Sequence, residues 1–436
     1  MKAGRVLVAL LFLVGGVGSL INGSAVFTRL FYLSLLIVLV ALLWTRLSVV
    51  GLRIHRQVRL QKAGAGDVFE ERFEIHNASP FMVPNVEIAN ESKLPGAAGS
   101  RLLTRIGGRR NISYLSRTYL THRGRFALGP TTVRSGDPFG LFQASRQFPA
   151  EESLTVLPTI YEIAAFPSAP GILPGGRTIR RKSSEVTPHA ASVREYAPGD
   201  PLKSIHWPTT ARRGKLMVKE FEQDPQAEVW IFIDLQDGVH YAKPYTPPVF
   251  AAVQLLYGRP PKFILPPSTL EYSVSIAASL SHYFIGQKRA VGLAAAGRRA
   301  TVIPAERSDR QESKILETLA FLEDDGDLSL AALAPMQAHQ LKTGSSVILI
   351  TPEVRADIVS ATEELQRRGL HPIVVLIDPK EFGGPPGAEK LEKTLISRGV
   401  PVCRVRYNND LTQTLSAFAS AQGDFSWQRI PLSQLT

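Results

Sequence analysis

Residues 229–233, VWIFI, form a continuous apolar run, and this run decides the fold of the second half of the chain. An uninterrupted apolar segment of this length is typical of a strand that is buried on both faces of a parallel sheet. After it, segments with helical periodicity alternate with further short apolar segments. Helices are expected over 273–287, 311–323, 356–369 and 388–399, and strands over 290–296, 301–305, 345–350, 371–377 and 400–405. This alternation predicts a doubly wound α/β domain over 229–436, with any ligand site beyond the carboxyl ends of its strands.

The region upstream, residues 53–157, has the pattern of an all-β domain. Residues 68–77, VFEERFEIHN, alternate apolar and polar side chains as a half-buried strand does. Residues 131–136 and 153–158 predict further strands, and turn-forming residues recur between the segments at short spacing. We therefore expect a small β-sandwich, in which residues 137–140, DPFG, form a turn with a buried phenylalanine.

The amino-terminal region, residues 1–52, contains two long uncharged segments. Residues 6–28 are long enough to span a bilayer, which needs about 20 apolar residues. Residues 30–45 can be extended to Leu52 if Arg46 reaches the membrane interface. These segments predict two transmembrane helices joined by a short turn.

The charges around these segments predict an orientation. Basic residues flank both outer ends, whereas Arg29 alone marks the connecting loop, and the positive-inside rule then places the soluble domains in the cytoplasm at the cell membrane. The flanking residues are Lys2, Arg5, Arg53, Arg56, Arg59 and Lys62. The alternative is a cleaved signal peptide that ends at the small residues 23–25.

The net charge of +12 is concentrated in the first half of the chain. Residues 229–436 hold 21 lysines and arginines against 21 acidic residues, whereas residues 1–62 hold eight basic residues and no acidic one. Such a surface can face nucleic acid, anionic lipid or an acidic partner. Membrane lipid is favoured and nucleic acid is not expected, because the basic region begins beside a membrane segment. The single cysteine, Cys403, excludes an intrachain disulfide and is expected to be a buried structural thiol.

Residues 158–228 connect the two soluble domains. A segment over 158–192 that is rich in proline, glycine and serine leads into residues 193–222, where ionisable side chains are interleaved with aromatic ones. Disordered tails lack such aromatic residues, so we expect an ordered, charged surface on which a partner docks. Its candidate residues are Arg194, Glu195, Tyr196, Gly199, Asp200, His206, Trp207, Arg212, Lys219 and Glu220.

The short blocks REYAPGD, IHW and LMVKEFE within 193–222 occur in the order seen in the bacterial family known as domain of unknown function 58, which this chain resembles. The blocks RGRFALGP and SGDPFGLF within 123–142 are similar to that family's upstream region. The resemblance implies a membrane anchor, a carboxy-terminal von Willebrand factor A-like domain and an association with MoxR-type AAA+ ATPases. It implies no catalytic activity.

The von Willebrand A resemblance raises the question of a metal site. That fold places Asp-x-Ser-x-Ser directly after its first strand, where this chain has residues 234–238, DLQDG. Asp234 is retained but both serines are replaced, and a hard cation needs several oxygen ligands, so we expect that the site is lost. The alternative is a metal-dependent ligand-binding module, in which Gln236, Asp237 or Glu353 completes a Mg²⁺ site with Asp234. The proline-rich insertion over 238–272 is expected to be a lid or a partner-contact loop.

The charged residues of 193–222 also allow a catalytic interpretation. His206 with Asp200 or Glu195 could supply acid and base for a hydrolase. However, the sequence has no nucleophile elbow, phosphate-binding lysine loop or HExxH motif beside them. A hydrogen-bonded structural histidine is favoured, together with an ion-pair network among the charged residues of 193–222. We therefore expect a non-enzymatic, membrane-anchored adaptor or scaffold that needs no cofactor and acts with a MoxR-type ATPase in envelope or complex assembly.

Overall fold

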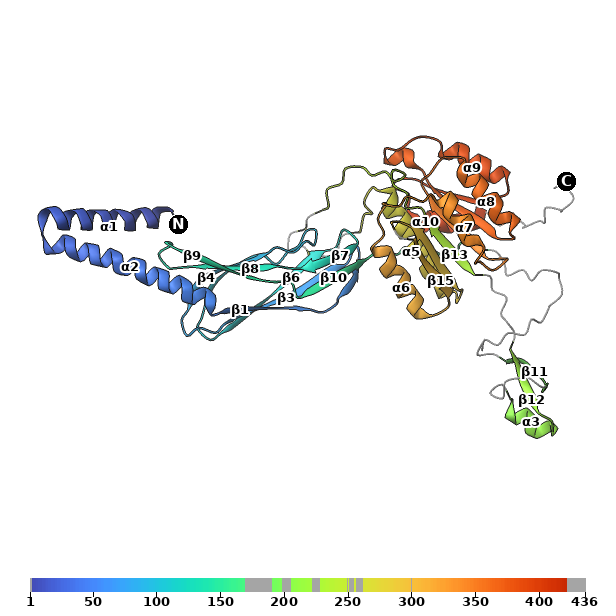
Figure 1. The fold of residues 1–436 in the computed structure, drawn as a ribbon, viewed down its shortest axis with the longest axis horizontal. Coiled ribbons are helices and arrows are strands. Elements are labelled where there is room, and N and C mark those ends of the chain that lie inside the picture. Colours follow the sequence, from blue (N-terminus) through green and yellow to red (C-terminus); the bar gives the residue numbers. More distant parts are fainter. Residues whose placement is uncertain are drawn as a thin grey trace. The chain divides into compact units, whose positions relative to one another are not determined.

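The computed structural model describes residues 2–168, 190–197, 205–221, 228–248, 250, 255, 262–298 and 300–421. These residues form two compact units (Figure 1). The first, called here the β unit, comprises residues 1–159, 244–266 and 316–322. The second, called the α/β unit, comprises residues 160–243, 267–315 and 323–436.

The amino-terminal region consists of two apolar helices, α1 (Lys2–Asn22) and α2 (Ala25–Val50). Spans of 19 residues in α1 and 26 residues in α2 are long and apolar enough to cross a membrane. The turn between them contains Gly23, which adopts the left-handed conformation with φ of 56°. The predicted pair of apolar helices is therefore present, and the orientation of the soluble regions stays a prediction.

Three antiparallel or mixed sheets make up the rest of the β unit. Their orders are β1-β3-β6, β2-β10-β7 and β5-β4-β8-β9. The strands are β1 (Leu52–Val58), β2 (Lys62–Gly64), β3 (Val68–Asn77), β4 (Val83–Asn90), β5 (Arg101–Ile106), β6 (Asn111–Tyr119), β7 (Gly124–Leu128), β8 (Thr131–Gly136), β9 (Gln143–Phe148) and β10 (Glu152–Leu157). All three strands that were predicted over 68–77, 131–136 and 153–158 are confirmed.

The alternation of β3 puts one side of the strand inside the β unit. Phe69, Phe73 and Ile75 are buried on that side, and so is Glu71. The inward face therefore carries a carboxyl group between two phenylalanines, which the polar and apolar alternation of the sequence did not reveal.

The prediction of a buried phenylalanine in the turn at 137–140 was wrong. Phe139 is 49% exposed, whereas Asp137 and Leu141 are buried. The Asp137 carboxylate accepts the backbone N–H of Phe139 at 2.8 Å and that of Phe142 at 2.5 Å. The carboxylate closes the turn from inside, so the aromatic ring at its tip points away from the core.

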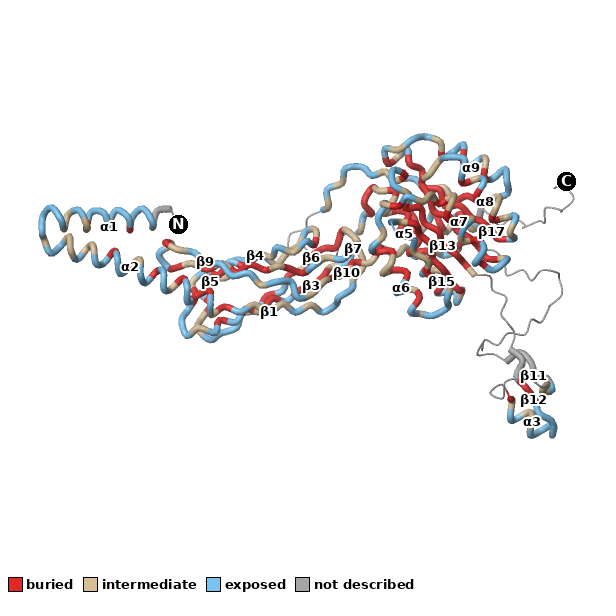
Figure 2. The backbone as a smooth tube through the Cα atoms, in the orientation of Figure 1, coloured by how far each residue is buried: buried red, intermediate tan, exposed pale blue. Residues whose placement is uncertain are grey.

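The α/β unit is built on a six-stranded sheet of order β15-β14-β13-β16-β17-β18. All neighbouring strands are parallel except β14 and β15, which are antiparallel. The strands are β13 (Val229–Ile233), β14 (Val291–Ala296), β15 (Ala300–Glu306), β16 (Ser346–Thr351), β17 (His371–Ile377) and β18 (Val402–Val405). Every residue of β13, β14 and β16 is buried (Figure 2), as expected for strands covered on both faces.

Helices cover this sheet, as the alternation predicted. Trp230 and Phe232 of β13 share one apolar cluster with Leu333 and Leu365, so α7 and α8 cover the same face. The helices of the unit are α5 (Thr269–Gly286), α6 (Asp309–Ala320), α7 (Leu330–Ala338), α8 (Asp357–Arg367), α9 (Ala388–Ser397) and α10 (Leu411–Ala421), with a 3-10 turn η2 (Pro379–Phe382). Sequence reasoning missed α7 and α10. Cys403 in β18 is buried, as expected, and burial raises the pKa of its thiol to about 12.

Candidate functional site

Part of the region between the two soluble domains folds as a small module, which we call the signature hairpin and define as residues 190–197 and 205–221. Strands β11 (Ala190–Glu195) and β12 (Met217–Phe221) pair antiparallel, with Glu195 opposite Met217. The short helix α3 (Trp207–Arg213) precedes β12 and ends at Gly214, which is left-handed with φ of 67°. Ile205, Met217 and Val218 are buried and form the apolar interior of the hairpin.

His206 caps helix α3. Its Nδ1 lies 2.7 Å from the Thr209 hydroxyl and accepts the Thr209 backbone N–H at 3.3 Å. Its own backbone N–H donates to the Met217 carbonyl at 2.8 Å, which joins the start of α3 to β12. His206 therefore caps α3 through its side chain and connects α3 to β12 through its backbone, which is a structural role.

The charged candidates are only partly described. Glu195 forms an ion pair with Lys215 at 3.1 Å, a partner that sequence reasoning did not name, and both side chains are about two-thirds exposed. Such an exposed pair contributes little stability. Gly199 and Asp200 lie outside the described residues. The backbones of Arg194, Lys219 and Glu220 lie in β11 and β12, and their side chains lie outside what the structure describes.

The outer surface of the signature hairpin combines an aromatic side chain with positive charge. Trp207 is 64% exposed and Leu216 is 45% exposed. Arg212 and Arg213 in the last turn of α3 are both exposed, whereas Tyr196 is of intermediate exposure. Tryptophan is buried on average in folded proteins, so a mostly exposed one on a module that also exposes two arginines marks a surface suited to a partner.

A second site lies at the carboxyl edge of the α/β sheet. The strand order reverses between β13 and β16, and open sheets of this kind bind ligands beyond the strand ends at that point. Asp234 follows β13 and is 2% exposed. Its carboxylate accepts the Thr351 hydroxyl at 2.6 Å, from the end of β16, and the Gln236 backbone N–H at 3.3 Å. Burial raises the pKa of Asp234, and these hydrogen bonds offset part of that effect.

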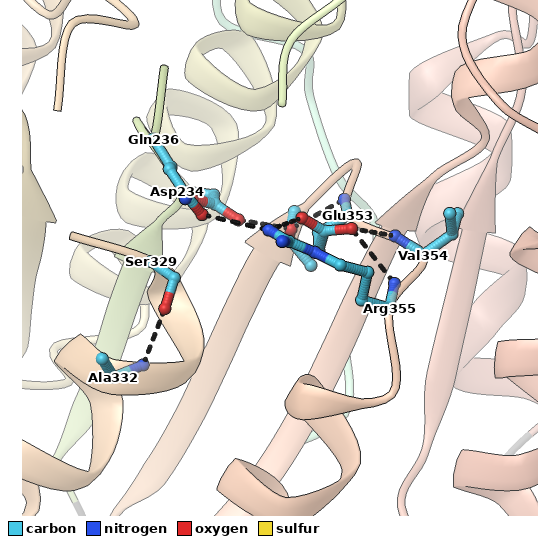
Figure 3. A network of polar contacts seen from close by, with 8 residues as sticks. Asp234, Gln236, Ser329, Ala332, Glu353, Val354 and Arg355 are labelled. Atoms are coloured by element: carbon cyan, nitrogen blue, oxygen red, sulfur yellow. Dashed lines mark hydrogen bonds and ion pairs between the residues drawn. The ribbon is translucent and has the colours of Figure 1, made fainter. Parts of the chain in front are cut away.

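The loop after β16 brings a second carboxylate and an arginine to the same edge (Figure 3). One oxygen of Glu353 accepts the backbone N–H groups of Val354 and Arg355 at 3.0 and 3.1 Å. The other oxygen lies 2.5 Å from Nη2 of Arg355. The same Nη2 is 3.4 Å from the side-chain oxygen of Gln236, so the guanidinium bridges the two loops.

Protein groups already surround these oxygens, and the guanidinium of Arg355 supplies positive charge beside them. Both oxygens of Asp234 and both of Glu353 already accept hydrogen bonds from protein groups. Within the residues that the structure describes, no group of three His, Cys, Asp or Glu side chains is placed to hold a metal ion. Gly238 adopts a left-handed φ of 74°, which a serine rarely adopts.

Three further residues of this edge, His240, Thr269 and Thr351, were not predicted. Nε2 of His240 lies 2.8 Å from the backbone oxygen of Asp234, and its Nδ1 lies 3.0 Å from the Thr269 hydroxyl. Thr351 lies one residue beyond the strand that was predicted over 345–350. Their positions could have revealed them. Thr351 ends β16, Thr269 begins α5 and His240 lies in the segment after β13.

Part of the proline-rich insertion belongs to the β unit. The described residues within 244–266 are part of that unit, and they include Phe250, whose ring lies 5.0 Å from that of Tyr119. The backbone oxygen of Leu255 accepts a hydrogen bond from Arg117 at 2.9 Å. The role of the insertion as a lid or partner-contact loop stays a prediction.

Comparison with solved structures reveals only weak similarity. The CARDB domain of the PF1109 protein in complex with di-metal ions, from Pyrococcus furiosus, is 10% identical with a TM-score of 0.18, over 24% of this chain and 91% of that chain. The C-terminal domain of wzt is 10% identical with a TM-score of 0.18, over 25% of this chain and 75% of that chain. Similarities at this level support no conclusion about this protein.

Comparison of sequences is more informative. The uncharacterized protein YeaD of Bacillus subtilis (strain 168) is 27% identical over 367 residues, which cover 81% of this chain and 80% of that protein. Residues 192–246 match the family described as protein of unknown function DUF58, and this match includes β11, α3, β12 and β13. The blocks REYAPGD, IHW and LMVKEFE, which carried the resemblance, fall inside this matched segment, and over it the chain is similar to the DUF58 family.

Proposed function

We propose that this protein is a non-enzymatic, membrane-anchored adaptor that recruits a partner through the signature hairpin. The observation that carries the proposal is the exposure of Trp207 on a module with its own small apolar interior. The hairpin has five basic residues against two acidic ones within 190–197 and 205–221, so the partner it fits is an acidic surface with an apolar pocket. The partner proposed from the family resemblance is a MoxR-type AAA+ ATPase, acting in envelope or complex assembly.

The organisation of the chain supports this role. The helices α1 and α2 would anchor the protein in the membrane, with the soluble regions in the cytoplasm, where an ATP-dependent partner works. The three sheets of the β unit would form a β-sandwich that acts as a spacer. The α/β unit, with its strand order and its Asp234 after the first strand, would be a von Willebrand A-like module that contacts the client.

Neither alternative has an observation in its favour. The hydrolase hypothesis needs His206 as acid or base, and its Nδ1 serves as the cap of α3. The metal-dependent hypothesis needs a cation beside Asp234, and the described residues bring the guanidinium of Arg355 to that edge.

The test is co-purification from native membranes with the full-length protein. Trp207→Ala and the double variant Arg212→Glu with Arg213→Glu are expected to lose the bound ATPase, since alanine substitution of an anchoring tryptophan typically costs 2 kcal/mol or more of binding, about thirtyfold in affinity. Matched controls are Met336→Ala on α7, which is 59% exposed, and Arg367→Glu on α8, whose side chain is 67% exposed. The proposal is wrong if the ATPase is retained by the hairpin variants, or lost equally by the control variants.

A further inference from the structure

The carboxyl edge of the α/β sheet holds two carboxylates on adjacent loops with an arginine beside them. Asp234 follows β13, Glu353 follows β16, and Thr351 connects them, because its hydroxyl donates to Asp234 and accepts the backbone N–H of Glu353 at 2.9 Å. The side chains are shielded from water: Asp234 is 2% exposed and the Glu353 side chain 18%. Two shielded carboxylates at one edge require a counter-charge or a proton.

Arg355 supplies that counter-charge. Its Nη2 contacts Glu353 and reaches Gln236, so a single nitrogen connects the loop after β16 to the loop after β13. The hydrogen bond and charge of Glu353, and more weakly the charge of Asp234, raise the pKa of Arg355. The guanidinium therefore stays protonated at every pH at which the protein is folded.

We propose that the guanidinium of Arg355 is a built-in cation that takes the position of a divalent metal ion at this edge, links the loops after β13 and β16, and excludes metal. The inference concerns a site separate from the signature hairpin and does not depend on the proposed adaptor function. It makes the edge independent of the metal supply, since the positive charge belongs to the chain.

Loss of the Arg355 guanidinium would have a consequence that loss of a merely structural arginine would not have. Without the guanidinium, one oxygen of Glu353 and the side-chain oxygen of Gln236 lose their cationic partner, close to the carboxylate of Asp234. The exposed Asp237 lies on the same loop. Carboxylate and amide oxygens are the ligands that Mg²⁺, Mn²⁺ and Ca²⁺ prefer, so removal of Arg355 should create affinity for these ions.

The experiment uses the full-length protein in detergent and measures Mn²⁺ binding by calorimetry and by the signal of free Mn²⁺ in electron paramagnetic resonance. Arg355→Ala and Arg355→Met are expected to bind one Mn²⁺ at least about tenfold more tightly than the wild-type protein, because the charge of the ligand set tunes affinity over orders of magnitude. Adding Asp234→Asn to either variant should abolish the gain. Arg355→Lys should bind no better than wild type, since it keeps the positive charge.

Arg298 offers a matched control. It pairs with Asp325 at 3.2 Å and its side chain is 83% exposed, so Arg298→Ala removes an exposed arginine from an acidic partner in the same unit. This variant should leave Mn²⁺ binding unchanged. The proposal is overturned if wild-type protein already binds Mn²⁺ in a manner that Asp234→Asn abolishes. It is also overturned if both Arg355 variants keep the wild-type circular dichroism spectrum and gain no affinity, or if Arg298→Ala gains as much.

Discussion

Nε of Arg56 on β1 lies 3.4 Å from an oxygen of Glu71 on β3, and both side chains are enclosed within the β unit, with exposed fractions of 12% and 1%. The guanidinium also lies over the ring of Phe73, 4.7 Å from its centroid, and donates to the side chain of Asn90 at 2.7 Å. Among the described residues, Nε and Nη1 of Arg56, Oε1 of Glu71 and the Ser116 hydroxyl have no hydrogen-bond partner.

The Arg56–Glu71 pair lies between two apolar clusters of the β unit. One apolar cluster contains Phe73 and Ile75, and a separate one contains Phe69, although all three residues lie on the inward face of β3. Glu71 falls between Phe69 and Phe73 on that face. The stability of the β unit should therefore depend on the charge state of one buried carboxyl group.

The first prediction concerns pH. Burial raises the pKa of Glu71 from 4.5 to about 7, with Arg56 opposing the shift and Glu152 adding to it. Because the folded protein keeps a proton that the unfolded chain releases, the β unit should lose stability as pH rises from 4.5 to 7 and level off above. The loss is at most about 1.4 kcal/mol per pH unit. Thermal unfolding from pH 5 to pH 8 should reveal this slope in the wild-type protein and a flatter one in Glu71→Gln.

Glu70 provides the control for that measurement. It is the adjacent residue on β3, it pairs with Arg117 at 2.5 Å and its side chain is 37% exposed. Glu70→Gln should keep the wild-type pH dependence. An identical slope in Glu71→Gln and wild type would show that Glu71 does not titrate in this range.

The second prediction tests the pair itself. Arg56→Met should destabilise the protein more at pH 8 than at pH 5, because the Glu71 carboxyl loses its counter-charge and must take up a proton, at a cost of about 1.4 kcal/mol per pH unit above its pKa. The double variant Arg56→Met with Glu71→Met should recover most of that loss, since apolar side chains of similar size can replace a buried pair. A double-mutant cycle in urea gives the coupling energy, and a value near zero would contradict the interaction.

The third prediction separates the structural role of His206 from a catalytic one. Asparagine and aspartate are good helix caps, so His206→Asn and His206→Asp should keep both the fold and complementation of a deletion strain. His206→Ala should lower stability by about 1 kcal/mol through loss of the cap. Loss of complementation in His206→Asn at wild-type melting temperature and ATPase binding would instead support the hydrolase hypothesis.

The fourth prediction concerns topology. Because basic residues flank the outer ends of α1 and α2, the soluble regions should lie in the cytoplasm, and protease added to intact spheroplasts should leave residues 60–436 undigested. The amino-terminus of the isolated protein should still carry residues 1–25. Digestion from outside, or a chain that begins near Val26, would restore the signal-peptide alternative.

Local patterns predicted most elements of the α/β unit and three of the ten strands between residues 52 and 157. The run at 229–233 and the alternation after it predicted the parallel strands and most of their covering helices, because burial on two faces demands apolar residues at nearly every position. The apolar segments of the first 50 residues predicted α1 and α2, because a helix that crosses a bilayer needs about 20 apolar residues. Helices α7 and α10 were not predicted, because their small and polar residues weaken the helical periodicity. Phe139 was wrongly predicted to be buried, because the turn is closed by the Asp137 carboxylate and not by the aromatic ring.

The sequence by itself therefore determined the two apolar helices, most elements of the α/β unit, the family that the chain resembles and an acidic residue, Asp234, directly after β13. Only the tertiary structure decided that Gln236 and Arg355 meet at the same edge, because they are 119 positions apart and come together only when β13 and β16 lie side by side. The same holds for Arg56 and Glu71, whose charges pair because two neighbouring strands turn them inward. Periodicity reports the environment of one residue at a time, whereas the partner of a buried charge is set by the strand order and register of the sheet.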